Sequence, residues 1–576
     1  PPRATHRHHR AGDVLMLLQR LVEYSDSRDS TIPPFHRDLE FHWQLELAAD
    51  GTLAARELTP LVDDTSTKPR GVRHVVPYTV RTRGVAPQLA ADDIQYVLGW
   101  ADPHSKAEWV AHCHEEFRAL CARWADSETG GGDPVAQAVA RFYAAGLETQ
   151  VHQPEEFSSK QRVLIAVDGR PAYRAGSVVP FWSAEVATLK GGGTRGVCLV
   201  CGRVGDLLDT LPAKVKSTLV PGATNDAALV SINERVFGYD LTTRLAGSPV
   251  CLACGEAIGA ALVDILGSAH ATSYADQDSR LAWWLTGSTD SDPMRLLDEA
   301  NPDDVLPWLA SVHHGTPLAG ASDRTAFCSL TVGGNYARIM VRDWVDMPLT
   351  ELEANIAAWF DDHEMSPVAR NARRHHPMWA LALSLGRWDR TAERYVDFRT
   401  RGADRPTHTQ RDLQRAAIRG LPVPVSLLRH LIHRISTDGH LDDARAALIR
   451  LCLTRSPLSG EKPMPDLDTT NTDPSYIAGR IFAVLEQIQQ DANRDQKLNT
   501  TYGDRYFSGA VLNPRAAITS GRRDATAWLK KLRRAGTAHY RERELDDLFA
   551  LIPPGEGLPG RASLRQQSQF LLGYHQ

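Results

Sequence analysis

Short runs of alternating apolar and polar residues dominate the first half of the chain, a pattern typical of β-strands. Residues 43–60 and 162–173 alternate on both sides of an Asp-Gly dipeptide. Because Asp-Gly accommodates the positive φ angles of a tight turn, both segments predict β-hairpins. Residues 329–344 alternate in the same way, which places Arg338 and Arg342 on one face of a predicted strand.

The apolar spacing changes to a helical period in other parts of the chain. Residues 105–124 predict a helix in which Ser105 and Glu108 form a capping box and Trp109 belongs to the buried stripe. After about residue 350 the hairpin signals stop, and helical segments follow one another. Strands followed by helices predict an α+β fold, with a mixed α/β N-terminal region and an all-helical C-terminal bundle.

Breaks between these patterns suggest where the domains begin and end. The first fifteen residues carry three histidines among arginines without an apolar period, so they predict an extension outside the fold, with a metal-binding tail as the alternative. A segment rich in Pro, Ser, Gly and Asp predicts a linker. The expected parts are a disordered extension (1–15), an α+β region (16–350), a helical arginine-rich region (351–454), the linker (455–475) and a helical bundle (476–576).

The composition is that of a protein able to build large cores. The 576 residues are 42% hydrophobic and 23% charged, and no run approaches the 18 apolar residues of a membrane span. Eight cysteines are too few for a disulfide-rich secreted protein, and we find no secretory signal. We therefore expect a cytoplasmic protein that does not interact with a membrane.

Four cysteines form two C-x-x-C pairs, Cys198 with Cys201 and Cys251 with Cys254. Four thiolates at this spacing suit a closed tetrahedral zinc site. The pattern predicts structural Zn2+ in a zinc-ribbon-like insertion at about residues 195–256, with no ligand position left for catalysis. Four incidental cysteines or a redox pair are the alternatives.

Small and polar residues lie between the two cysteine pairs. Gly222, Thr224 and Asn225 precede an apolar run, and a loop of this kind lets the backbone approach a groove or a phosphate closely. Lys214 and Lys216 lie just upstream and favour phosphate over the alternative, an ordinary surface turn.

The net charge of −5 conceals a strongly basic segment. Residues 370–419 contain twelve arginines and five acids, so this segment carries +7 and the rest of the chain −12. Two basic clusters lie on predicted helices, and both predict surfaces that follow nucleic-acid phosphates, with solvated surface as the alternative. The first consists of Arg411, Arg415 and Arg419, and the second includes Arg522, Arg523, Lys530 and Arg534.

Familiar catalytic motifs are missing from the sequence. It has no P-loop, no G-x-S-x-G and no G-x-G-x-x-G that opens a helix. His112, His114 and Glu115 could suggest a metal-bound hydrolytic site, but they fall on the polar side of the helix predicted at 105–124. The residues alone predict a nucleic-acid-binding protein that is not an enzyme. A metal-dependent nuclease and a zinc-ribbon DNA-binding scaffold protein are the alternatives.

Five segments, taken in order along the chain, carry a family resemblance. They are MLLQRLVEY from residue 16, VRTRGVAPQLAADDIQYVLGW from 80, GATNDAALVSIN from 222, TVGGNYARIMVRDW from 331 and, near the end, YIAGRIFAVLEQIQ with FLLGYHQ. Together they resemble the large subunit of the subtype I-C CRISPR Cascade effector complex, the Csd-type family, over residues 16–576.

The resemblance implies a non-catalytic subunit of a ribonucleoprotein complex in antiviral defence. Such a subunit recognises the protospacer-adjacent motif (PAM) on duplex DNA, aids duplex opening, stabilises the displaced strand and helps to recruit a helicase–nuclease. The implied partners are the CRISPR guide RNA, target DNA, and the backbone and guide-processing Cascade subunits. Arg81, Thr82 and Arg83 match an Arg-Thr segment of the family, and this match makes them candidates for contacts with the guide end or the PAM.

The resemblance also implies that the helical C-terminal end is similar to the Cascade small subunit, which can arise by internal initiation within the same gene. Met464 is the last methionine of the chain and lies in the predicted linker. We therefore expect residues 464–576 to exist also as a separate helical bundle that lines the displaced strand.

Overall fold

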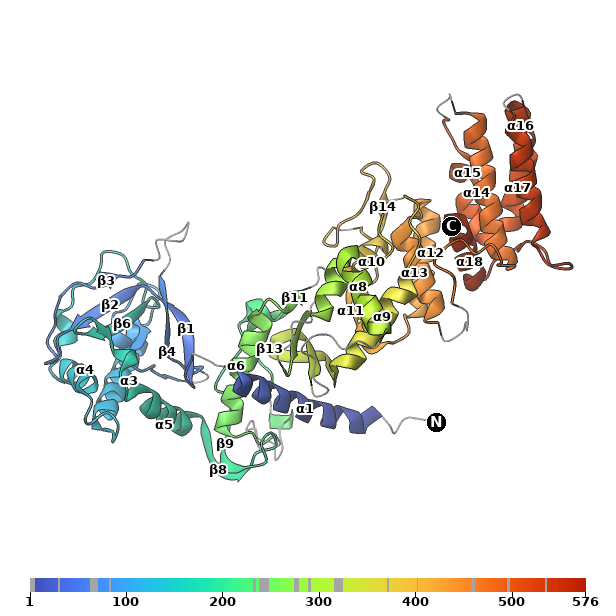
Figure 1. Ribbon diagram of the computed structural model, residues 1–576. Helices are drawn as coiled ribbons and strands as arrows, with labels where there is room; N and C mark the ends of the chain where they lie inside the picture. The colour runs from blue at the N-terminus through green and yellow to red at the C-terminus, as the bar shows by residue number, and fades with distance from the viewer. Residues whose placement is uncertain are drawn as a thin grey trace. The chain divides into compact units, whose positions relative to one another are not determined.

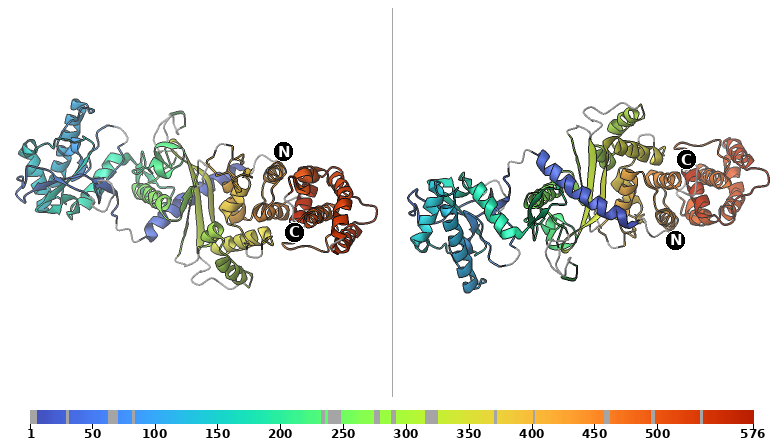
Figure 2. Two further views of the ribbon diagram at one scale, coloured as in Figure 1. Left: turned by 90° about the horizontal axis from the view of Figure 1, so that it is seen from above. Right: turned by 90° about the horizontal axis from the view of Figure 1, so that it is seen from below.

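The computed structural model divides the chain into two compact units (Figures 1 and 2). Unit 1 holds Pro1–Thr272, Asp278–Trp283 and Ser329–Trp344, and unit 2 holds Ser273–Gln277, Trp284–Cys328 and Val345–Gln576. The structure describes residues 6–28, 32–62, 71–81, 84–231, 235–237, 248–273, 279–287, 292–314, 325–369, 372–400, 402–456, 462–494, 498–533 and 536–576.

A five-stranded sheet forms the centre of the N-terminal core in unit 1 (Figure 1). Its order is β3-β2-β6-β5, with β7 paired to β6; β2 and β6 run parallel, whereas β5 runs antiparallel to β6. β6 is buried over almost its whole length because its residues after Arg162 are apolar. The strands are β2 (Trp43–Leu47), β3 (Thr59–Pro60), β5 (Ala91–Asp93), β6 (Arg162–Val167) and β7 (Arg170–Pro171).

Helices and a second strand pair complete this core. β1 (His36–Phe41) and β4 (Val72–Pro77) pair antiparallel in register from His36 opposite Pro77 to Phe41 opposite Val72. The buried side chains of both strand sets and of the helices form one hydrophobic cluster. The helices are α2 (Ile94–Val97), α3 (Ala107–Asp126), α4 (Pro134–Ala144) and α5 (Val178–Lys190).

Both predicted Asp-Gly turns are confirmed. Asp168 and Gly169 have φ angles of 48° and 74°, and they join β6 to β7 as a two-residue hairpin. Gly51 has a φ of 89° in the turn after β2, where the Ala48 amide donates to the Thr52 carbonyl at 2.9 Å. Only glycine adopts such a φ angle without strain.

Two details predicted for the helix at 105–124 are wrong. α3 begins at Ala107 without a side-chain cap, because the Ser105 hydroxyl instead bonds to the backbone of Asp102. Trp109 is 45% exposed, since the buried stripe runs through Val110 and Cys113 and leaves Trp109 on the flank.

The first helix extends further toward the N-terminus than the apolar pattern indicates. α1 spans His6–Ser27, whereas we expected ordered structure to start at Met16. Residues 6–15 include no proline, and their arginines, alanine and leucine have high helix propensity, which is compatible with continuation of the helix.

A hairpin, a helix and a second sheet form the remainder of unit 1. β8 (Gly191–Val197) and β9 (Val204–Leu208) pair antiparallel, and α6 (Leu252–Gly267) lies beside α1, where the Tyr24 hydroxyl donates to Asp264 at 2.5 Å. The second sheet has the order β10-β13-β12-β11. Its strands are β10 (Ala223–Ala228), β11 (Ala271–Ser273), β12 (Arg280–Leu285) and β13 (Ala326–Pro348), and the ends of β11, β12 and β13 fall in unit 2.

Unit 2 is almost entirely helical, and all the helical segments expected after residue 350 are confirmed. Both views of Figure 2 show the orange and red helices of its C-terminal part packed side by side. One short strand pair, β14 (Trp388–Asp389) with β15 (Arg394–Tyr395), interrupts the helices. The helices are α7 (Pro293–Glu299), α8 (Pro302–His313), α9 (Leu349–His363), α10 (Met378–Ser384), α11 (Thr409–Arg419), α12 (Val425–Asp438), α13 (Asp443–Thr454), α14 (Pro474–Ala492), α15 (Tyr502–Leu512), α16 (Pro514–Arg533), α17 (Ala538–Ala550) and α18 (Leu564–His575).

The fold is therefore mixed α/β in its N-terminal part and helical in its C-terminal part, as predicted. The described residues contain no helix that is both long enough and apolar enough to cross a membrane. The boundaries predicted near residue 350 and at 455–475 stay predictions. Unit 2 runs through both boundaries, and His575 in α18 contacts Asp443 in α13 at 2.9 Å.

Candidate metal and nucleic-acid sites

The four predicted cysteines meet in unit 1, where their Sγ atoms all lie within 4.8 Å of one another. Cys198 and Cys201 belong to the turn between β8 and β9, whereas Cys251 and Cys254 begin α6. The Leu199 amide donates to the Pro249 carbonyl at 2.9 Å and so joins the two halves of the cluster. Four thiols at this separation could hold one metal ion.

Backbone amides near the cluster favour a thiolate at Cys198. The amides of Val200 and Cys251 point at its Sγ atom, at 3.4 and 3.3 Å. Burial alone would raise the pKa of Cys198, but the backbone donors outweigh it and lower this pKa to about 7. A thiolate is the form of cysteine that binds metals.

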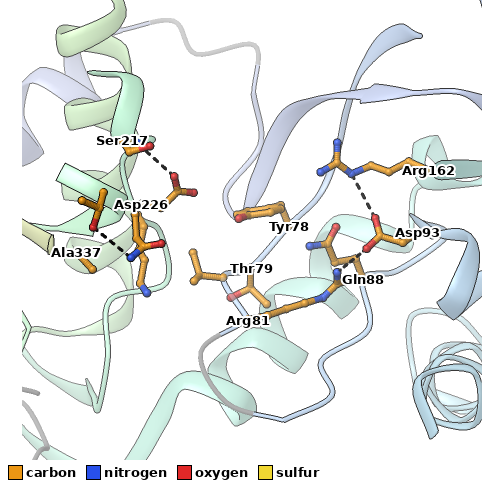
Figure 3. Close-up of a pocket in the computed structure, with 13 residues that line it drawn as sticks. Tyr78, Thr79, Arg81, Gln88, Asp93, Arg162, Ser217, Asp226 and Ala337 are labelled. Atoms are coloured by element: carbon orange, nitrogen blue, oxygen red, sulfur yellow. Dashed lines mark hydrogen bonds and ion pairs between the residues drawn. The ribbon is translucent and has the colours of Figure 1, made fainter. Parts of the chain in front are cut away.

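A pocket of about 700 Å³ is the second candidate site, and all its lining residues belong to unit 1 (Figure 3). One wall comes from residues 78–93 together with the start of β6, and the other from residues 214–226 and Ala337 in the middle of β13. The lining residues are Tyr78, Thr79, Val80, Arg81, Gln88, Asp93, Arg162, Lys214, Ser217, Thr224, Asn225, Asp226 and Ala337.

Arg81 is held in place on the first wall by two aspartates. Its guanidinium contacts the buried Asp92, donates to Asp93 at 3.1 Å, and lies over the Tyr96 ring at 4.1 Å. Burial raises the pKa of Asp92 to about 6, although the charge of Arg81 opposes this shift. Asp93 also pairs with Arg162 at 3.6 Å (Figure 3). The aspartates thus fix both arginines and offset part of their charge.

The second wall carries a lysine without such neutralisation. No carboxylate of the described residues pairs with Lys214, whereas Asp226 accepts from the Ser217 amide at 3.2 Å. Thr224 and Asn225 are exposed on this wall. Residues 223–226 belong to strand β10 and not to the predicted loop, because Ala223 and Ala228 pair with β13 on either side of a register shift.

Hydrogen bonds anchor both walls to neighbouring segments of unit 1. Arg37 donates to the Lys214 carbonyl at 2.7 Å, and the Val80 amide donates to the Pro212 carbonyl at 3.2 Å. The buried Lys190 donates to the Val80 carbonyl at 2.6 Å, and burial lowers the pKa of Lys190. These bonds hold Val80 of the first wall and Lys214 of the second wall in place.

The pocket therefore brings together four predicted residues, Arg81, Lys214, Thr224 and Asn225, although they are far apart in the sequence. Lys216 is exposed and lies outside the lining, and so does Gly222, whose φ is 84°. Thr82 and Arg83 lie outside the described residues.

Sequence reasoning missed Arg162 as a pocket residue. It is the first residue of β6, before a run of apolar residues. Only its position at the start of an apolar strand could have indicated a role for Arg162, because a cation at the end of a buried strand must reach solvent or an acidic partner. The pairing with Asp93 depends on the antiparallel register of β5 and β6, which places Asp93 opposite Arg162.

The first basic cluster lies on α11 in unit 2. Arg415 is exposed, whereas Arg411 and Arg419 are half-buried, and Arg411 contacts Asp412 at 3.4 Å. Several other arginines of the basic segment 370–419 also serve internal contacts. Arg374 pairs with Glu364 and Asp466, Arg390 donates to the Asp438 carbonyl, and Arg405 donates to the Leu383 and Val396 carbonyls. The charge of +7 is therefore only partly available at the surface.

The second basic cluster lies on α16 and is more accessible. Arg522, Arg523 and Lys530 are exposed. Arg522 also lies over the Phe549 ring at 5.2 Å and approaches Asp546 at 3.8 Å. Arg534 lies outside the described residues.

The histidines considered for a hydrolytic site do not converge on a metal-binding arrangement. His114 Nδ1 is 2.8 Å from the Tyr96 carbonyl oxygen, its Nε2 is 3.6 Å from Glu148, and His112 is exposed. His114 therefore makes local structural contacts beside α2.

Together, the fold and these sites define a two-unit α/β protein with a four-cysteine cluster and a cation-lined pocket. The chain belongs to the CRISPR-associated protein family Cas_Csd1, whose model matches residues 18–576. Csd1 proteins are the large subunits of type I-C Cascade complexes, effector subunits that are generally not catalytic and that assemble with guide RNA. None of the curated proteins matches the sequence.

Proposed function

We propose that the unit 1 pocket is where this Cascade subunit contacts PAM-containing duplex DNA. The observation that carries the proposal is the convergence of Arg81, Arg162 and Lys214 with Thr224 and Asn225 around one hollow of about 700 Å³. Cations bind phosphates without regard to sequence, whereas a side-chain amide can bond to a base edge. The pocket thus combines the two kinds of contact that PAM recognition requires.

The residues of the pocket divide into two roles. Lys214, which has no carboxylate partner in the described part of the chain, binds phosphate. Asn225 bonds to a base edge, since it is exposed and its amide donates, among the described residues, to the Thr224 hydroxyl alone, at 3.4 Å. Arg81 and Arg162 hold the first wall in shape through Asp92 and Asp93 and direct their remaining N–H groups at the DNA.

Binding by the assembled complex to duplexes with intact and altered PAMs tests the proposal. Lys214→Ala should weaken binding to every duplex and lower the salt slope by about 0.9, as expected for one lost phosphate contact. Lys216→Ala is the matched control, because it removes the same charge two residues away, outside the lining. Asn225→Ala should change which PAM is accepted. Equal affinity for intact and altered PAMs in the unmodified complex would refute the proposal.

We also propose that α16 holds the displaced strand after the duplex opens. Arg522, Arg523 and Lys530 are exposed on one helix, the arrangement that suits phosphates of a single strand. Replacing all three by Gln should weaken binding on every target sequence and flatten the salt slope. An unchanged salt dependence would argue against this role, whether or not the variant still prefers the intact PAM.

The C-terminal helices and partner recruitment complete the proposed role. We propose that Met464 starts a separate small subunit, and that the large subunit helps to recruit the helicase–nuclease in the cytoplasm. Replacing the Met464 codon by a leucine codon should remove the small polypeptide from the purified complex. An unchanged amount of that polypeptide would contradict internal initiation.

We propose that the metal of the four-cysteine cluster is structural Zn2+. Four thiols are the ligand set of closed zinc sites, and Zn2+ there would hold the β8–β9 turn against the start of α6. Elemental analysis should find one zinc per chain, and Cys198→Ser with Cys254→Ser should abolish it. A metal-free chain purified with its thiols reduced would contradict the proposal.

A further inference from the structure

The middle of β13 presents an aromatic ring to solvent beside the pocket. Tyr336 is 75% exposed, and the next residue, Ala337, lines the pocket (Figure 3). In the pairing of β10 with β13, Tyr336 lies opposite Ala223, the neighbour of the pocket residue Thr224. The ring is therefore at the rim of the second wall.

The backbone at Tyr336 is in a conformation that costs free energy. Its φ of 56° lies in the left-handed region, which non-glycine residues adopt at a cost. An exposed ring contributes little burial in return. Folding therefore does not account for a tyrosine at this position, where glycine would fit without strain.

This part of β13 is firmly attached to the pocket wall. The Gly334 amide donates to the Pro221 carbonyl at 2.7 Å, and a Cβ atom at Gly334 would lie 2.2 Å from the Ala223 nitrogen. This close approach fixes Tyr336 relative to Thr224 and Asn225. A fixed ring loses less conformational entropy when a ligand stacks on it.

Two arginines follow the tyrosine along β13. Arg338 is half-exposed and Arg342 is exposed, and neither pairs with a carboxylate in the described ranges. Met340, 41% exposed, lies between them on the same strand face. An aromatic ring followed by unpaired cations is the combination that binds single-stranded nucleic acid, because the ring stacks on a base and the cations bind phosphates.

We propose that Tyr336, Arg338 and Arg342 bind an unpaired stretch of target DNA next to the pocket, with one base stacked on the Tyr336 ring. This inference rests on the proposed function, since duplex bound in the pocket would supply the unpaired nucleotides where it opens. The two arginines bind the phosphates of the nucleotides that follow the stacked base.

Variants of the assembled complex test the stacking. Tyr336→Gly removes the ring and relieves the backbone strain, so it leaves the strand folded, while Tyr336→Phe keeps the ring. We expect Tyr336→Gly to weaken binding to an intact PAM duplex roughly 5- to 150-fold and Tyr336→Phe to leave it unchanged. Tyr540→Ala is the matched control, because Tyr540 is 67% exposed on α17 and should have no effect.

A fluorescent base identifies the strand that is bound. 2-Aminopurine next to the PAM, placed in the target strand or the displaced strand, should be quenched in only one of the two, and Tyr336→Gly should abolish that quenching. Arg338→Ala with Arg342→Ala should lower the salt slope by about 1.4, the value for two contacts to a single strand.

The outcomes separate this inference from the proposed function. Normal PAM preference with unchanged affinity and unchanged 2-aminopurine signal in Tyr336→Gly would overturn the stacking alone. If the Tyr336→Gly complex lost its guide RNA and kept its affinity for DNA, the stacking would also be overturned, because the ligand would then be RNA. Equal binding of intact and altered PAMs by the unmodified complex would instead refute the proposed function.

Discussion

Replacing Gly334 by alanine should disturb the pocket through the contact between β13 and β10. The added Cβ would meet the nitrogen, Cα and Cβ of Ala223 at 2.2, 2.6 and 2.6 Å. Ordinary van der Waals contact begins near 3.4 Å, so one strand must move by about 1.2 Å. Thr224 and Asn225 follow Ala223 directly, and a shift of this size exceeds the range of donor–acceptor distances that a hydrogen bond tolerates.

Gly334→Ala should lower the free energy of unfolding by about 1–3 kcal/mol, the usual cost of overpacking. It should also weaken PAM-specific binding by about tenfold, since a lost base contact costs about 1–3 kcal/mol. Urea denaturation of the full chain and duplex binding by the assembled complex measure the two effects. Gly176→Ala is the control, because no atom lies within 4 Å of its added Cβ. A Gly334→Ala protein with unchanged stability and unchanged PAM binding would refute this reasoning.

Three further predictions concern stability and metal. Asp438→Asn leaves the buried Arg434 and Arg445 without their shared carboxylate, so urea denaturation should show a loss of about 3–5 kcal/mol; a loss below 1 kcal/mol would contradict it. Burial lowers the pKa of His375 to about 4, so the unfolded state binds more protons between pH 6.5 and 4. Stability should therefore fall on acidification, by about 2 kcal/mol from pH 7 to 5 for this group alone, and His375→Gln should reduce the fall. Removal of metal by a chelator should increase proteolysis around Cys254, and added zinc should reverse it.

Local sequence patterns were enough to predict much of the fold. The Asp168-Gly169 turn was predictable because its φ requirements are met within two residues. The helices after residue 350 were predictable because their apolar stripes repeat with the helical period. The Ser105 cap failed because a competing bond to Asp102, three residues earlier, satisfies the same hydroxyl.

The two candidate sites also differ in how far local sequence patterns could predict them. The four cysteines were predictable as a set, since C-x-x-C spacing constrains each pair locally. The pocket was predictable only in fragments. Arg81 and Lys214 line the same pocket because long-range contacts bring their segments together. One such contact is the hydrogen bond from Arg37 to the Lys214 carbonyl, between residues 177 positions apart.

The sequence alone was enough to predict the element types, the cysteine pairs and the presence of local basic clusters. Each of these depends on residues close to one another in the sequence, within a turn or a strand. Folding decided which cations are available, because long-range contacts pair Arg374 and Arg405 internally and leave Lys214 and Arg342 without carboxylate partners in the described part of the chain. It also decided the position of Tyr336, since strand pairing over more than one hundred residues brings this ring to the pocket rim. Such pairings depend on the packing of the whole unit, and no local pattern encodes them.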